Sequence, residues 1–212
     1  MLSCEQIAGL LGKGAAQDRT GLTIVPCPEI DALLARGATS IDLRLGRWLR
    51  SFRQTRVQSV SLVGSNPSER QQALGRSKEH FVRFGEKFVL HPGRFVLGVT
   101  LEWLRLPAGV SGYVTGKSSL GRHGLVIETA AGIHPWFSGC LTLEMANVGE
   151  VPLELYPGML VCQIFLHETK PHEHENGEHR IAQLGRFHGS RKPTLPEPKS
   201  DEIFQRLSAP EP

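Results

Sequence analysis

Seven short apolar runs follow one another closely between residues 88 and 166, and they constrain the fold more than any other feature. Turn signals such as His91-Pro92-Gly93, Pro107-Ala108-Gly109 and Tyr156-Pro157-Gly158 separate several of them. Short strands at close intervals between prolines and glycines are typical of antiparallel sandwiches and jelly rolls. The sequence therefore predicts a mainly β fold with a few short helices. The runs are 88–90, 95–100, 112–115, 125–127, 140–146, 153–155 and 159–166.

The N-terminal part of the chain predicts two short helices before the first long strand. Residues 3–11 carry apolar side chains at helical spacing behind Ser3, a favourable N-cap, and Gly12 is expected to end this helix. A second helix is expected over residues 29–36. Residues 40–45 then alternate between polar and apolar side chains, which is the period of a half-buried strand.

The length and composition indicate one globular domain followed by a polar segment. The chain has 212 residues, 40% of them hydrophobic, which is enough to bury a substantial core. We expect residues 1–168 to form the core, including the N-terminal helical segment, and residues 169–212 to form a polar tail. Within the core, the polar segment 65–87 is expected to be a loop between strands.

The composition argues against several classes of function. A formal net charge of +3 is too small an excess to indicate a nucleic-acid-binding protein. No run approaches the roughly 20 apolar residues that span a bilayer, and the first residues lack the basic start of a secretion signal. We therefore expect a cytoplasmic protein with no membrane partner. The four cysteines form no CxxC pair, which disfavours a zinc ribbon and a disulfide framework.

The run from Gly116 to Gly124, GKSSLGRHG, has the chemistry of a phosphate-binding loop. Serine hydroxyls and backbone N–H groups donate to phosphate oxygens, glycines permit close approach, and an arginine adds paired hydrogen bonds. The same residues are also compatible with a polar turn whose cations are solvated. The residues alone leave both interpretations open.

The run 140–146 predicts a strand that presents a carboxylate on one face. Alternation places Leu141, Leu143 and Met145 on the buried side and Thr142 with Glu144 on the other side. A glutamate that lines a cleft can act as a general base. A glutamate on a solvated sheet face is the alternative, and the strand pattern does not separate the two.

These motifs together resemble the dCTP deaminase family, a branch of the trimeric dUTPase superfamily. The similar segments are GKSSLGRHGL, AAGIHPWFSGCLTLE and VPLELYPGMLVCQIF, and they occur in the order of the family. FVLHPGRFVLGVTLEWLRLP and the strand around Asp42 extend the resemblance upstream, so that it covers most of residues 37 to 167. The resemblance implies a distorted jelly roll, or dUTPase-like β-barrel, that assembles as a homotrimer with active sites between subunits.

The resemblance also implies roles for individual residues. Glu144 is expected to be the catalytic base, with Thr142 and Leu143 along the base and sugar of a deoxycytidine nucleotide. A magnesium ion is expected to arrive with the triphosphate. Zinc is not expected, because the H-x-E and P-C-x-x-C signature of zinc deaminases does not occur. The residues expected to hold the triphosphate, or to lie in the same loop, are Lys117, Ser118, Ser119, Leu120, Gly121 and Arg122.

The chain departs from the family pattern at two places. His134 stands where the family has an aspartate in Ile-Asp-Pro-Gly, and imidazole brings no fixed negative charge near the sugar. In the tail, residues 185–194 are similar to the closing segment of the family, with Arg186 or Lys192 as candidate phosphate contacts and the tail as a candidate lid. Gln163 matches a recurring glutamine of the last core strand, where a structural hydrogen bond is equally expected.

The sequence therefore predicts hydrolytic deamination of dCTP to dUTP and ammonia, without zinc. The missing aspartate argues against further hydrolysis, because the corresponding residue in dUTPases is linked to pyrophosphate release. Three alternatives remain: a bifunctional enzyme that gives dUMP, a deaminase of a modified or less phosphorylated cytosine nucleotide, and a catalytically silent nucleotide-binding trimer.

Overall fold

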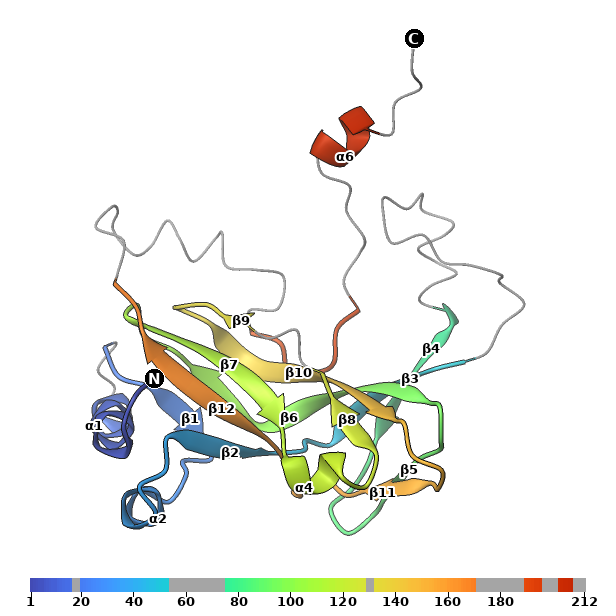
Figure 1. Cartoon of the computed structure of the whole chain (residues 1–212), viewed down its shortest axis with the longest axis horizontal. Helices are drawn as coiled ribbons and strands as arrows, with labels where there is room; N and C mark the ends of the chain where they lie inside the picture. The colour runs from blue at the N-terminus through green and yellow to red at the C-terminus, as the bar shows by residue number, and fades with distance from the viewer. Residues whose placement is uncertain (17–19, 54–74, 129–131, 171–188, 196–201, 208–212) are drawn as a thin grey trace.

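The computed structural model describes residues 1–16, 20–53, 75–128, 132–170, 189–195 and 202–207. Strands dominate and helices are short, which confirms the predicted mainly β fold (Figure 1). The helices are α1 (Cys4–Ala15), α2 (Ile30–Ala35), α4 (Ser118–Gly121) and α6 (Glu202–Leu207). The strands are β1 (Thr23–Val25), β2 (Ser40–Arg44), β3 (Trp48–Phe52), β4 (Ser77–Phe81), β5 (Phe88–Leu90), β6 (Phe95–Arg105), β7 (Val110–Gly116), β8 (Leu125–Ile127), β9 (Gly132–Ile133), β10 (Ser138–Asn147), β11 (Leu153–Leu155) and β12 (Leu160–Glu168).

The described strands form two main antiparallel sheets and one small sheet, and these do not close into a single barrel within the described residues. The larger sheet has the order β4-β3-β6-β10-β8, with β1 also paired to β6. The second main sheet has the order β2-β12-β7-β9, and β11 pairs with β5. Helices α1 and α2 lie beside β1 and β2 at one end of the sheets (Figure 1). None of the described helices is long and apolar enough to cross a membrane.

The pairing of β6 with β10 lies at the centre of the larger sheet. Leu143 and Met145 of β10 are fully buried and lie opposite Gly98 and Val96 of β6. Gly98 leaves room for the Met145 side chain, because a Cβ atom at that position would lie 2.6 Å from Met145 Cε. The alternation predicted for residues 140–146 is therefore present, with the apolar face in the core.

Helix α1 begins as predicted but continues past Gly12, so the predicted end was wrong. Ser3 and Gln6 form a capping box at its start. The helix runs on to Ala15 because its last turn packs closely against the following segment: a Cβ on Gly14 would lie 1.9 Å from the Leu22 carbonyl oxygen. This tertiary contact outweighs the cost of about 1 kcal/mol for a glycine inside a helix.

A strand lies where the polar sequence had predicted only a loop. β4 falls within the segment 65–87 and pairs along the whole of β3, from Trp48 opposite Phe81 to Phe52 opposite Ser77. An edge strand is held by backbone hydrogen bonds and carries polar side chains without penalty, so hydrophobic alternation did not reveal it. Residues 54–74 lie outside the described residues.

The Glu102 carboxylate ties the two main sheets together inside the core. Glu102 of β6 is only 5% exposed, and its Oε2 accepts a hydrogen bond of 2.8 Å from the backbone N–H of Arg44 on β2. Beside it, the Thr100 hydroxyl donates to the Glu102 carbonyl oxygen and accepts from the Leu141 N–H. Burial raises the pKa of the Glu102 carboxyl, and the hydrogen bond from Arg44 opposes this rise.

This raised pKa predicts a pH-dependent stability that Glu102→Gln removes. Because the folded protein holds the proton more tightly than the unfolded chain, the contribution of Glu102 is fully present below its unfolded pKa. It is lost as the pH rises through the folded pKa. The amide oxygen of glutamine keeps the acceptor for Arg44. Thermal unfolding at pH of about 5 and about 8 should therefore show Tm of the variant gaining on wild type as the pH rises. A Tm difference that does not change with pH would contradict this assignment.

Candidate active site

The predicted phosphate loop forms a short exposed turn of helix at the end of β7. Ser118 and Ser119 are the first residues of α4, whose first backbone N–H groups have no acceptor within the helix. Ser118, Ser119, Gly121 and Arg122 are exposed, whereas Leu120 packs against the core and anchors the turn. The loop is also fastened to the neighbouring strand, because the Lys117 N–H donates to the Val161 carbonyl oxygen over 3.1 Å.

Lys117 has a fixed ionic partner that the sequence had not suggested. Its ammonium lies 2.6 Å from Oδ1 of Asp42, and the two side chains are 25% and 27% exposed. Asp42 comes from β2, which is joined to β7 through β12, where Gln163 lies opposite both Asp42 and Thr115. The Gln163 side-chain oxygen accepts from the Ser40 hydroxyl over 3.0 Å. Gln163 thus makes a hydrogen bond within the sheet, and Asp42 orients the Lys117 ammonium.

Thr142 and Glu144 lie side by side along the half-exposed face of β10. Both are half-buried, and Leu143 between them is fully buried. The Glu144 carbonyl oxygen accepts from the Glu128 N–H over 3.0 Å, which extends the pairing of β8 with β10. A carboxylate in this position is held on a rigid strand and remains accessible to a bound molecule and to water.

Strand β8 joins the phosphate loop to the strand that carries Glu144. The Val148 N–H, just beyond β10, donates to the Gly124 carbonyl oxygen over 2.9 Å at the end of the loop. Val148 lies four residues beyond Glu144, which corresponds to about 13 Å along a strand. The loop and the carboxylate are therefore held at a fixed separation by one continuous set of backbone hydrogen bonds.

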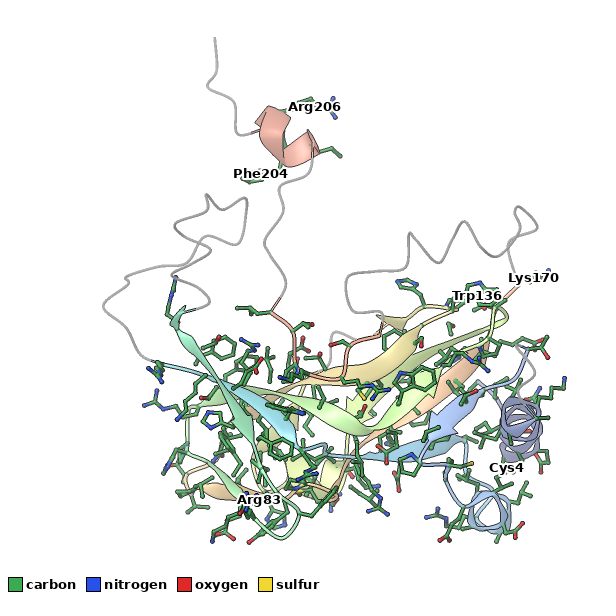
Figure 2. All side chains as sticks on the ribbon, turned by 180° about the vertical axis from the view of Figure 1, so that it is seen from behind. Cys4, Arg83, Trp136, Lys170, Phe204 and Arg206 are labelled. Carbon is green, nitrogen blue, oxygen red and sulfur yellow. The ribbon has the colours of Figure 1, made fainter. Side chains whose placement is uncertain are left out.

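His134 lies apart from these residues, in the turn between β9 and β10. It is exposed, and its carbonyl oxygen accepts from the Phe137 N–H over 3.2 Å. Trp136 in the same turn has φ of 68°, a left-handed conformation that costs a residue with a side chain about 1–3 kcal/mol. In Figure 2, Trp136 lies on the same side of the molecule as Cys4 and Lys170.

Trp136 also lines a mostly apolar cavity of about 530 Å³ that is separate from the predicted nucleotide residues. The cavity lies between α1 and the turn from β6 to β7, and Leu2, Leu10, Pro107 and Val110 form much of its wall. None of the described residues predicted to bind nucleotide lines it. The candidate active site is therefore defined by the loop and by β10, and not by this cavity.

Arg186 and Lys192 are the two tail cations predicted to contact phosphate, and the structure describes only Lys192. Arg186 lies outside the described residues. Lys192 lies against the β3–β4 pair, with its ammonium 3.9 Å from the centroid of the Trp48 ring and 3.4 Å from Glu79 Oε2. Residues 189–195 and α4 lie on opposite sides of the sheets (Figure 1). Within one chain the structure thus does not bring Lys192 to the phosphate loop, and its role toward phosphate stays a prediction.

Three of the four cysteines, Cys4, Cys140 and Cys162, are buried. Burial raises the pKa of the Cys140 thiol, and it raises the pKa of Cys162 to about 12. A thiol with a raised pKa is a poor nucleophile at neutral pH.

A family model for dCTP deaminase-like proteins matches residues 2–169. The chain belongs to this family. It is 43% identical over 169 residues to a protein named "dCTP deaminase, dUMP-forming" from Mycobacterium avium (strain 104), a match that covers 79% of this chain and 83% of that protein. A protein of the same name from Mycolicibacterium gilvum (strain PYR-GCK) is 42% identical over 158 residues, 74% of this chain and 78% of that protein. The resemblance drawn from the motifs is confirmed.

The fold is also similar to a solved structure. The crystal structure of 2'-deoxycytidine 5'-triphosphate deaminase from Agrobacterium tumefaciens matches with a TM-score of 0.54 and 24% identity. The match covers 85% of this chain and 51% of that chain. At this identity the likeness concerns the fold, and it supports the predicted distorted jelly roll.

We predict a measurable coupling between Lys117 and Asp42. Because both side chains are about three-quarters buried, a double-mutant cycle with Lys117→Met and Asp42→Asn should give a coupling free energy of about 0.5–1 kcal/mol in urea unfolding. The ion pair between Lys87 and Glu154 is the matched control, since its side chains are 49% and 47% exposed. A Lys117–Asp42 coupling no larger than that of the control would contradict the proposed orientation of Lys117.

Proposed function

We propose that this protein hydrolyses the exocyclic amine of dCTP and that Glu144 is its catalytic base. The observation that carries the proposal is the placement of Glu144 on the half-exposed face of β10, with the loop 117–122 fastened through β8 to the same strand. Relatives at 43% identity that are named for this substrate support it. Thr142 would line the base and sugar through its side chain, and Leu143, whose side chain is buried in the core, could do so only through its backbone.

The chemistry requires one group that moves protons between water and the leaving amine. Glu144 takes a proton from a water molecule as its oxygen forms a bond to cytosine C4. The carboxyl group gives this proton to N3 of the ring, takes the proton of the new C4 hydroxyl and passes it to the amine as the C–N bond breaks, which leaves a C4 carbonyl group and ammonia. A carboxylate on a rigid strand can perform these transfers without moving.

The triphosphate would be held by the loop, with Lys117, Ser118, Ser119 and Arg122 as donors. Hydroxyls, the first amides of α4 and an arginine fork suit phosphate oxygens. We propose that magnesium enters with the triphosphate, whose oxygens are the hard ligands that this ion prefers. The Asp42 carboxylate beside Lys117 adds an oxygen donor of the same class. No zinc is required in this proposal.

We propose dUMP, rather than dUTP alone, as the final product. The relatives named dUMP-forming support this bifunctional alternative more strongly than the deaminase that the sequence had favoured. The single observation on the other side is His134, which stands in place of the aspartate of the family pattern and brings no fixed negative charge.

We also propose a homotrimer in which each site combines residues of two subunits. Within one chain the loop and residues 189–195 lie on opposite sides of the sheets, so a nucleotide that touches both needs a neighbouring copy (Figure 1). The outer face of the second sheet offers a contact surface: Tyr113 is 43% exposed and stacks on Phe165 and His167. The predicted cytoplasmic location is part of the same proposal.

Glu144→Gln is expected to lower the rate of ammonia release from dCTP by about 10²-fold or more, because the amide cannot accept the proton of water. Binding of dCTP, measured by calorimetry, should be largely retained. Glu150→Gln, an exposed glutamate just beyond β10, is the control and should keep wild-type turnover. Wild-type turnover in Glu144→Gln would exclude Glu144 as the base. Binding of dCTP without product in the wild type would favour a silent trimer or a modified substrate.

The product of the wild-type protein decides between a bifunctional enzyme that gives dUMP and a deaminase that stops at dUTP. We expect dCTP to give dUMP, ammonia and pyrophosphate without accumulation of free dUTP, in anion-exchange chromatography sampled over time. Accumulation of dUTP without pyrophosphate would instead establish a deaminase alone. In that case His134→Asp, which restores the carboxylate of the family pattern, should introduce dUMP.

A further inference from the structure

Residues 189–195 dock on an edge of β10 that β8 does not cover. β8 pairs with β10 only at Met145 to Asn147. Near the start of β10, the Gly189 N–H donates to the Ser138 carbonyl oxygen over 2.6 Å, and the Cys140 N–H donates to the Ser190 carbonyl oxygen over 2.9 Å. These two bonds attach the C-terminal segment to the strand that carries Glu144.

Gly139 between these two bonds permits the close approach of the segment. Its φ of 146° is a conformation that side chains rarely adopt. A Cβ atom at this position would lie 3.2 Å from the Ser190 carbonyl oxygen and 3.3 Å from its nitrogen. The backbone at Gly139 is thus shaped to receive the segment.

The segment makes a second attachment, on the β3–β4 pair, through the Lys192 side chain and the Pro193 carbonyl oxygen. The Lys192 ammonium lies over the Trp48 ring and beside Glu79. The carbonyl oxygen of buried Pro193 accepts from Arg50 Nε over 3.1 Å, and Arg50 in turn pairs with Glu79. Two anchors, one on β10 and one on the β3–β4 pair, therefore hold residues 189–195.

The Trp48 ring is held in place by contacts that do not involve residues 189–195. Trp48 lies opposite Phe81 in the β3–β4 pair, with ring centroids 4.9 Å apart. The Arg47 guanidinium packs against the neighbouring rings, 4.2 Å from the centroid of Phe81 and 5.0 Å from that of Phe84. The indole is thus a preformed surface for the Lys192 cation.

Arg191 lies between the two anchors and has an exposed guanidinium. Within the described part of the chain it makes no hydrogen bond or ion pair, in contrast to Lys192. Burial raises the pKa of the Cys140 thiol, and the nearby charge of Arg191 opposes that rise. The Arg191 charge is therefore held close to β10, where an anion can pair with it.

We infer that Trp48 and Glu79 are positioning residues, which hold the C-terminal segment on β10 through Lys192 and so present Arg191 to the anionic part of a bound nucleotide. This inference rests on the proposed function only in its last step. It gives Lys192 a positioning role and gives the ligand contact to Arg191, which the motif comparison had not selected.

The attachment is tested by hydrogen exchange at the two amides that form it. Lys192→Met and Trp48→Leu should speed the exchange of the Gly189 and Cys140 amides about threefold to tenfold, as expected for loss of a cation–π contact. Lys192→Arg keeps a cation and should exchange as wild type. Phe84→Leu is the matched control, because it removes an aromatic ring that contacts Arg47 and not Lys192.

Unchanged exchange in both Lys192→Met and Trp48→Leu would overturn the attachment. Lys192→Met keeps the test valid if the Trp48 variant misfolds, because it removes the same contact by changing an exposed side chain. These measurements need no substrate, so they hold whether or not dCTP is the ligand.

The presentation of Arg191 is tested by binding in the Glu144→Gln background, where turnover does not interfere. Adding Arg191→Gln should weaken dCTP binding about tenfold in calorimetry with Mg²⁺, and leave binding of deoxycytidine unchanged. Adding Trp48→Leu or Lys192→Met should weaken dCTP binding about threefold. Parental dCTP affinity in the Arg191 variant would overturn the ligand contact. No binding of dCTP to the parent would instead count against the proposed function.

Discussion

The register between β6 and β10 is the constraint on which the rest of the structure depends. It is fixed by the buried side of β10, where Met145 fits against Gly98 and Leu143 is fully enclosed. A slip of one residue would turn Glu144 into the core and expose the apolar residues. The same packing that stabilises the sheet therefore fixes the face of β10 on which the candidate catalytic carboxylate lies.

Strand β2 connects this core to the phosphate loop through two neighbouring residues. The backbone N–H of Arg44 is held by buried Glu102, and the side chain of Asp42 pairs with Lys117. One strand serves both contacts, since Asp42 acts through its side chain and Arg44 through its backbone N–H. Loss of the Glu102 contact would loosen β2. The position of Asp42 on this strand would then change, and with it the position of the Lys117 ammonium.

Local patterns in the sequence were sufficient for the apolar strands from residue 88 onward and for the face of the strand on which Glu144 lies, because alternation is a property of the chain itself. They failed wherever a distant segment decides the outcome. Gly12 does not end α1, since Gly14 packs on Leu22, and β4 carries no apolar alternation because pairing with β3 alone defines it. The partners of Lys117 and Lys192 were likewise hidden: Asp42 and Trp48 are far from them in sequence and are brought near by sheet order.

The turn between β9 and β10 departs from the family pattern at two residues, His134 and Trp136. The family pattern has glycine where this chain has Trp136, and a φ of 68° is a conformation that glycine adopts freely. Trp136 keeps that conformation because both ends of the turn are fixed. Ile133 pairs with Gly112, and the Phe137 N–H donates to the His134 carbonyl oxygen. Of the two substitutions, Trp136 is accommodated by the fixed ends of the turn, and His134 removes the fixed negative charge that the aspartate of the family pattern would carry.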